Sequence, residues 1–153
     1  MYFRTLSEAG LRIRIKIEVN THERSPARPH IHVRHGVDSR WWSGEAGVRT
    51  FEPAELIATK IRALYQRSKG RDLFDLWLAL TELHLEPGRI LDAFGPYRPD
   101  GLTAALSIAN LRAKVSDAGF RADLAPLVVD APPDYHVETA AELIIAELLS
   151  GLR

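Results

Sequence analysis

Hydrophobic and polar residues alternate strictly along residues 11–20, LRIRIKIEVN. A period of two with β-branched residues predicts a strand with one buried face and one polar face. The apolar side carries Ile13, Ile15, Ile17 and Val19, and the polar side carries Arg12, Arg14, Lys16, Glu18 and Asn20. Further strands are predicted over 30–35 and 48–51. Between these two, 39–47 holds two tryptophans and two glycines and is predicted as a hairpin or irregular loop.

From Pro53 onward the apolar residues follow a helical period, at positions 56, 57, 61 and 64. Pro53 is suited to a helix start. Gly70 is suited to a left-handed C-cap that ends this helix, and Asp72 to the N-cap of a second helix reaching about residue 84. Later helices are predicted over 87–94, 102–116, 120–128 and 137–152.

Strands followed by helices indicate an α+β fold, divided into a β-rich part, 1–51, and a helical part, 52–153. Three short strands provide little core for an independent domain. We therefore expect the β-rich part to be a portion of a larger sheet.

Composition excludes several classes of protein. The 153 residues contain no cysteine, which rules out disulfides, a thiolate zinc site and a cysteine nucleophile. No apolar run reaches the roughly 18–20 residues of a membrane span. The first ten residues lack the pattern of a signal peptide, so a cytoplasmic location is expected.

The net charge of zero hides an asymmetry between the two halves of the chain. Residues 1–71 hold 14 Lys/Arg and 7 Asp/Glu, whereas 72–153 hold 6 Lys/Arg and 13 Asp/Glu. A basic half is typical of proteins that contact phosphates or nucleic acid. The alternative is an uneven but merely solvated surface.

The densest cluster of charges is KIRALYQRSKGRDLFDL, from Lys60 to Leu76. On one continuous helix, Lys60, Arg67, Arg71 and Asp75 would share a stripe. If Gly70 breaks the helix, a tight turn still brings Arg71, Asp72 and Asp75 near the end of the first helix. Cations that neutralise phosphate oxygens, beside carboxylates that hold Mg²⁺ or orient a hydroxyl, indicate phosphoryl chemistry. The alternative is a helix surface with ordinary ion pairs.

Two weaker features lie in the β-rich part. Lys16 and Glu18 share the polar face of the first strand. Glu18 is interpreted either as a metal ligand or base beside the lysine, or as part of a solvent-exposed pair with it. His30 and His32 share a strand face and could bind a metal ion. No HExxH motif and no nearby carboxylate supports a metal site there, so the alternative is a pair of histidines on a polar face.

The order of these motifs resembles a known family. A K-x-E strand (IKIEVN), then FEPAELIATKIRALYQR, then RDLFDL resembles the AbiEii/AbiGii-type nucleotidyltransferase toxins of type IV toxin–antitoxin and abortive-infection systems, which include the MenT-type toxins. The block from Lys60 to Leu76 is similar to their lysine-to-RDxxD block, and FRADLAPLV to a late segment. The resemblance covers residues 11–80 well and is looser beyond.

The resemblance implies a nucleotidyltransferase-like mixed sheet followed by a helical domain, and transfer of a nucleoside monophosphate from an NTP, with Mg²⁺, to the 3′ end of tRNA. Lys60, Arg67, Arg71 and Lys16 would bind the nucleotide. Asp75 would be the essential acid of the block, supported by Asp72, and Glu18 a catalytic carboxylate and metal ligand. A winged-helix antitoxin protein would be the partner.

The sequence departs from the family at one point. Such enzymes carry a small-residue turn and a D-x-D pair before the K-x-E strand, and no D-x-D occurs in these 153 residues. Transfer by this chain is therefore expected if an upstream segment supplies D-x-D. The alternative is a truncated or split, non-catalytic module that binds RNA or an antitoxin.

Overall fold

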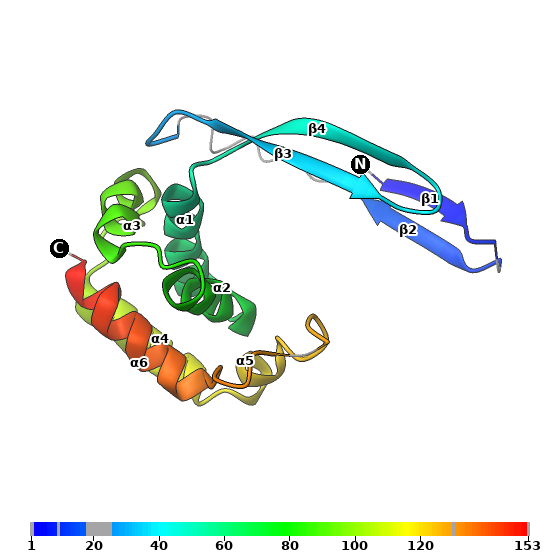
Figure 1. The fold of residues 1–153 in the computed structure, drawn as a ribbon. Coiled ribbons are helices and arrows are strands. Elements are labelled where there is room, and N and C mark those ends of the chain that lie inside the picture. The colour runs from blue at the N-terminus through cyan, green and yellow to red at the C-terminus, as the bar shows by residue number, and fades with distance from the viewer. Residues whose placement is uncertain (1, 9, 18–25, 130, 153) are drawn as a thin grey trace.

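The computed structural model describes residues 2–8, 10–17, 26–129 and 131–152 and shows an α+β chain. All the strands precede all the helices, and they extend as an arm from a helical body (Figure 1). The strands are β1 (Tyr2–Leu6), β2 (Arg12–Lys16), β3 (Ile31–Asp38) and β4 (Ser43–Thr50).

The strands pair as two antiparallel hairpins. β1 pairs with β2, placing Tyr2 opposite Lys16 and Leu6 opposite Arg12. β3 pairs with β4 through a turn in which the Ser39 amide and hydroxyl both bond to the Trp42 carbonyl. The hairpin predicted over 39–47 is therefore confirmed, with β4 beginning earlier than expected. The described strands make antiparallel ladders only.

The predicted burial of the first strand's apolar face is wrong for the residues that the structure describes. Ile13 is 42% exposed and Ile17 is 43% exposed. Residues 18–20 of the predicted strand lie outside the described residues, and β1 was not predicted. The alternation identified a strand correctly, but a period of two indicates only that one face is apolar, not that another element covers it.

After β4, the described elements are all helices, joined by turns and loops. The main ones pack against each other, α1 on α2 and α3, and α6 on α2 and α4. Their bounds are α1 (Pro53–Gln66), α2 (Gly70–Thr81), α3 (Pro87–Phe94), η1 (Gly95–Tyr97), α4 (Ala104–Val115), α5 (Ala118–Ala122), α6 (Val137–Glu147) and η2 (Leu149–Gly151). The helix predicted over 87–94 is confirmed to the residue, whereas the one predicted over 120–128 is shorter and begins earlier.

The hydrophobic core lies within this helical body. Its buried cluster begins at Ala54 and ends at Leu152, and includes Ile61 of α1, Leu73 of α2 and Ile144 of α6. Burial of apolar area at about 25 cal/mol per Å² makes this cluster the main source of stability. In the described part of the chain, no helix combines the length and apolar character that crossing a bilayer requires.

Two predicted cap residues have other roles. Gly70 is the first residue of α2 rather than a left-handed cap, and Lys69, not Asp72, is its N-cap. Gly70 is required by a close approach, because a Cβ there would lie 2.2 Å from the Phe120 carbonyl oxygen. The glycine therefore lets α2 begin directly against the end of α5.

Candidate functional site

The turn between α1 and α2 brings together Lys60, Asp72 and Asp75, so the helix is broken as one of the two sequence interpretations required. Lys60 Nζ lies 2.6 Å from Asp75 Oδ2 and 3.9 Å from Asp72 Oδ1. Residues 60 and 75 are half-buried, which leaves both side chains reachable from solvent. One ammonium group is thus held between two carboxylates at the surface of the helical body.

Asp72 is the buried member of this group. Its side chain is 0% exposed and accepts two hydrogen bonds from Arg67, from Nε at 3.1 Å and from Nη2 at 2.6 Å. Paired guanidinium–carboxylate bonds of this kind are strong and directional. Asp72 therefore fixes Arg67, and with it the end of α1, against the first turn of α2.

Arg71 and Lys69 lie on a different side of the turn from Asp75, as their partner shows. The Arg71 amide donates to Asp123 Oδ2 at 3.3 Å, and Lys69 Nζ lies 3.2 Å from Asp123 Oδ1. Burial raises the pKa of Asp123, but the Arg71 amide bond, the Lys69 hydrogen bond and both positive charges outweigh it, so the pKa lies below its ordinary value. The late segment, 120–128, thus supports the turn from outside.

Lys114 of α4 supports the other end of the turn. Its ammonium donates to the carbonyls of Leu64 and Tyr65, the latter at 2.8 Å, in the last turn of α1. Burial lowers the pKa of Lys114, and the charge of Asp72 opposes that shift. A cation at unpaired helix C-terminal carbonyls is favourable. The sequence analysis missed Lys114, and its position in an ordinary helix gave no signal.

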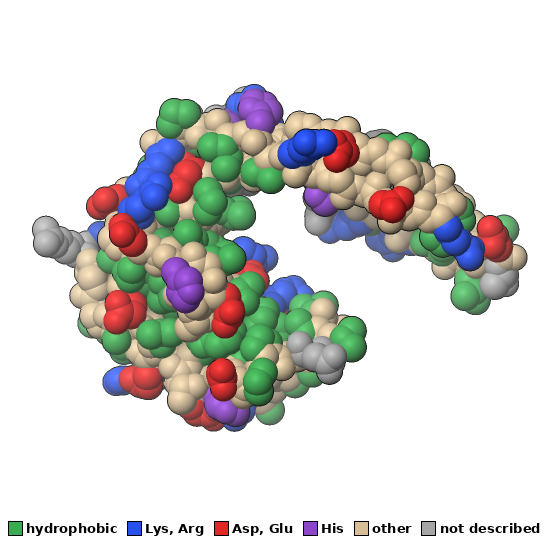
Figure 2. Space-filling model, viewed as in Figure 1, with side chains coloured by type: hydrophobic (Ala, Val, Ile, Leu, Met, Phe, Trp, Pro, Cys, Tyr) green, Lys and Arg blue, Asp and Glu red, His purple; other side chains and the backbone are tan. Residues whose placement is uncertain are grey.

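A cationic hollow of about 250 Å³ lies beside Lys60 on the surface of α1. Its lining residues are Thr59, Lys60, Arg62, Ala63, Gln66 and Arg67. Lys and Arg side chains lie on both sides of the open space between the β arm and the helical body (Figure 2). Three cations around one hollow provide the charge and hydrogen-bond donors that a triphosphate needs.

The described carboxylates do not form a metal site by themselves. Among the residues that the structure describes, no group of three His, Asp or Glu side chains is placed to hold an ion. Asp72 is already bonded to Arg67, and Asp75 to Lys60. This donor set fits the positioning of cations better than the binding of a divalent metal.

The described strand β2, which carries Lys16, lies in the arm, apart from the α1–α2 turn (Figure 1). Lys16 is exposed on β2, and Glu18 lies outside the described residues. His30 stacks on Phe51 with ring centroids 5.2 Å apart, and its Nδ1 lies 3.0 Å from Arg49 Nη2. His30 therefore contributes to the base of the arm.

A second carboxylate cluster, missed by the sequence analysis, joins the arm to the body. Glu55 is 0% exposed and accepts hydrogen bonds from the Ala27 amide at 2.6 Å, the Arg28 amide at 2.9 Å and the Tyr97 hydroxyl. Burial and the Glu55 hydrogen bond raise the pKa of Tyr97 to about 12. A glutamate on the apolar side of a helix, three residues after Glu52, was the available signal.

Glu52 completes this joint. Arg28 Nη1 lies 3.0 Å and Arg89 Nη2 2.9 Å from its two carboxylate oxygens. Three segments far apart in the sequence, around residues 27, 54 and 93, are thereby held at one point. The joint fixes where the arm leaves the body.

Comparison with protein families identifies a family model that matches most of the chain. The model described as "Nucleotidyl transferase AbiEii toxin, Type IV TA system" matches residues 2–143. Comparisons with curated proteins and with solved structures found no significant match. The match extends over both the arm and most of the helical body, including the turn that holds Lys60, Asp72 and Asp75.

Proposed function

Because the chain belongs to the AbiEii family of nucleotidyltransferase toxins of type IV toxin–antitoxin systems, we propose that it transfers a nucleoside monophosphate from an NTP to the 3′ end of tRNA, blocking translation. The observation that carries this proposal is the contact between Lys60 and Asp75 beside a cationic hollow. The family supports nucleotidyltransferase toxin activity in general. The tRNA acceptor and the translation block are the proposed details.

In this reaction the 3′-hydroxyl oxygen of the acceptor loses its proton to water and forms a bond to the α-phosphorus of the NTP. The bond from that phosphorus to the oxygen bridging to the β-phosphate breaks, and pyrophosphate leaves. Negative charge builds on the phosphate oxygens, so positioned cations lower the barrier. Lys60 and Arg67, which line the hollow, are the proposed phosphate-binding residues.

Asp75 and Asp72 have different proposed parts. Asp75 is the essential acid, because it contacts the ammonium of Lys60 and remains reachable by a nucleotide. Asp72 is a positioning residue, because it is buried and holds Arg67. Arg71 is proposed as a nucleotide-binding residue through its side chain, which is partly exposed beside Asp123. Lys16 and Glu18 are proposed to contribute from the arm.

The family implies a divalent metal, for which we propose Mg²⁺ with Glu18 as a ligand. A bound metal would supply positive charge at the reacting phosphate. Since Asp72 and Asp75 are engaged with cations, we propose that the D-x-D pair absent from these 153 residues provides the remaining ligands. An in-frame segment upstream of codon 1 that encodes a small-residue turn and D-x-D would support this.

The test uses α-labelled NTPs, Mg²⁺ and total tRNA, with the chain alone and with any upstream segment attached. The expected result is that label appears on the 3′ end of tRNA. Control tRNA whose 3′ ribose has been oxidised with periodate has no 3′-hydroxyl and should not be labelled. Asp75→Ala should abolish the label while circular dichroism remains unchanged. Label that survives Asp75→Ala, or that forms equally on oxidised tRNA, would overturn the proposal.

A second candidate is a non-catalytic module that binds RNA or an antitoxin. The observation in its favour is that the sequence contains no D-x-D. Magnesium-dependent NTP binding by the chain, measured by calorimetry, would argue against this candidate. Under either function, an antitoxin partner follows from the family, and we propose that this antitoxin is a winged-helix protein. We also propose that the protein acts in the cytoplasm. Its proposed domains are residues 1–51 and 52–153.

A further inference from the structure

The hairpin of β1 and β2 carries its charged residues on one face. Residues directly opposite each other in an antiparallel pair project to the same side. The register pairs Tyr2 with Lys16, Arg4 with Arg14 and Leu6 with Arg12. One face of the hairpin, called here the basic face, therefore presents Tyr2, Arg4, Leu6, Arg12, Arg14 and Lys16.

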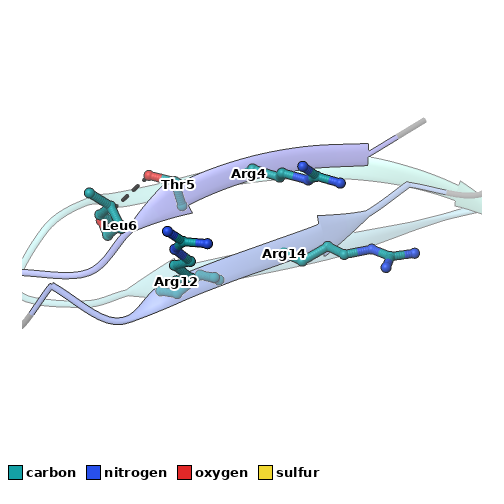
Figure 3. A pocket seen from close by; sticks show the side chains of 6 residues that line it. Arg4, Thr5, Leu6, Arg12 and Arg14 are labelled. Atoms are coloured by element: carbon teal, nitrogen blue, oxygen red, sulfur yellow. Dashed lines mark hydrogen bonds between the residues drawn. The ribbon is translucent and has the colours of Figure 1, made fainter.

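This arrangement has an energetic cost for the isolated fold. Arg4 and Arg14 are direct cross-strand neighbours of like charge, a pairing that destabilises a sheet. Within the described residues, no carboxylate forms an ion pair with Arg4, Arg12 or Arg14. Figure 3 shows Arg4 and Arg14 extending along the hairpin in the same direction. Water and salt screen this repulsion in part, and a bound anion would offset it directly.

The geometry favours a chain of anions over a single phosphate. Cations recur at every second residue of β2, which is about 7 Å apart at about 3.3 Å per residue. Arg12, Arg14 and Lys16 thus form a row about 13 Å long. A hollow of about 480 Å³ lies at the Arg12–Arg14 part of this row, and its lining is Arg4, Leu6, Arg12 and Arg14 of the basic face with Thr5 and Ile13 of the opposite face.

An aromatic ring accompanies the row. Arg14 lies over the Tyr2 ring, 4.0 Å from its centre, and Tyr2 is 51% exposed. Cationic grooves with exposed aromatic rings are typical of surfaces that hold single-stranded nucleic acid through its phosphates and bases. An acidic peptide would pair its carboxylates with the cations but has no bases to stack on the Tyr2 ring.

We propose that the basic face binds the phosphate backbone of an RNA strand. This site rests on the proposed function, since it would hold the RNA acceptor while the cationic hollow beside Lys60 holds the nucleotide. The two sites lie on different parts of the molecule, with Lys and Arg side chains on both sides of the space between arm and body (Figure 2).

The experiment measures binding of a fluorescent tRNA to the full chain without NTP or metal, as a function of salt. Arg12→Gln with Arg14→Gln is compared with Arg34→Gln plus Arg112→Gln, which removes the same charge from exposed residues elsewhere. At about 0.7 in salt slope per lost contact, the first variant should lose about 1.4 in slope and about twentyfold in affinity at 0.1 M salt. Each single variant should lose about fivefold.

Equal weakening by the two double variants would overturn the proposal, because it would indicate a general charge effect. Displacement of the RNA by polyglutamate or by phosphatidylserine vesicles at matched charge would overturn it too. If the double variant does not fold, the single variants decide. Because no nucleotide is transferred in this measurement, its result is independent of whether the labelling assay succeeds.

Discussion

At the scale of single residues, the α1–α2 turn depends on a glycine that no side chain can replace. Gly70 faces the Phe120 carbonyl, whereas a Cβ at Gly88 of α3 would meet nothing within 4 Å. We expect Gly70→Ala to lower the free energy of unfolding by about 1–3 kcal/mol through overpacking. Gly88→Ala should raise it by about 0.4–1 kcal/mol by restricting the unfolded chain. Urea unfolding followed by tryptophan fluorescence measures both, and equal stabilities would show that α5 does not constrain the turn.

Asp123 gives the same turn a dependence on pH. Its pKa in the folded chain lies below the ordinary aspartate value of 3.8, so its stabilisation is present above that pH and is lost as pH falls through the lower folded value. Asp123→Asn should therefore lower the melting temperature at pH 7, and the difference from the wild type should shrink below pH 3.8. Thermal melts between pH 2.5 and 7 measure this. A difference that is constant across the range would contradict the account.

At the scale of secondary-structure elements, substitution of the two aspartates of α2 should have different effects, because Asp72 contributes to stability and Asp75 to nucleotide transfer. Asp72→Asn removes the buried carboxylate charge that holds Arg67, whose own side chain is 51% exposed, and should cost about 2 kcal/mol of stability as charge-assisted hydrogen bonds are lost. Asp75 is 34% exposed, so Asp75→Asn should cost at most about 1 kcal/mol. The same Asp75→Asn variant should lose nucleotide transfer. Urea unfolding with the labelling assay measures both properties, and a stable, active Asp75→Asn variant would refute the assigned role.

The sequence predicted this helical part better than the arm. The period of 3.6 and Pro53 located α1, because its apolar residues form the core that the period reports. The motif predicted that a tight turn brings Asp72 and Asp75 near the end of α1, and the structure adds the contact between Asp75 and Lys60. The support that Asp123 and Lys114 give to the α1–α2 turn was not predicted. Asp123 lies 48 positions after Asp75, and Lys114 lies 54 positions after Lys60. Contacts so distant in the chain carry no local pattern.

At the scale of the whole molecule, the joint built on Glu55 holds the arm relative to the body. Glu55→Gln keeps the shape of the side chain but removes the charge that two amides and Tyr97 stabilise. We expect hydrogen exchange of the Ala27 and Arg28 amides to rise by about tenfold or more, as a charged hydrogen bond worth about 1.5–3 kcal/mol weakens. Exposed Glu82→Gln is the control. Unchanged exchange at both amides would show that the joint does not depend on this charge.

The central claim is that Lys60 binds the nucleotide whose monophosphate is transferred to tRNA. Lys69 offers a matched control, because it is a lysine of the adjoining α1–α2 turn that contacts Asp123 instead of the cluster. The most direct measurement is transfer of label from α-labelled NTPs to tRNA by the Lys60→Met and Lys69→Met variants, in the form of the protein that carries any upstream D-x-D. We predict loss of transfer by at least about 100-fold for Lys60→Met, in keeping with the loss of a cation that stabilises the transition state, and near wild-type transfer for Lys69→Met. Equal transfer by the two variants would contradict the claim.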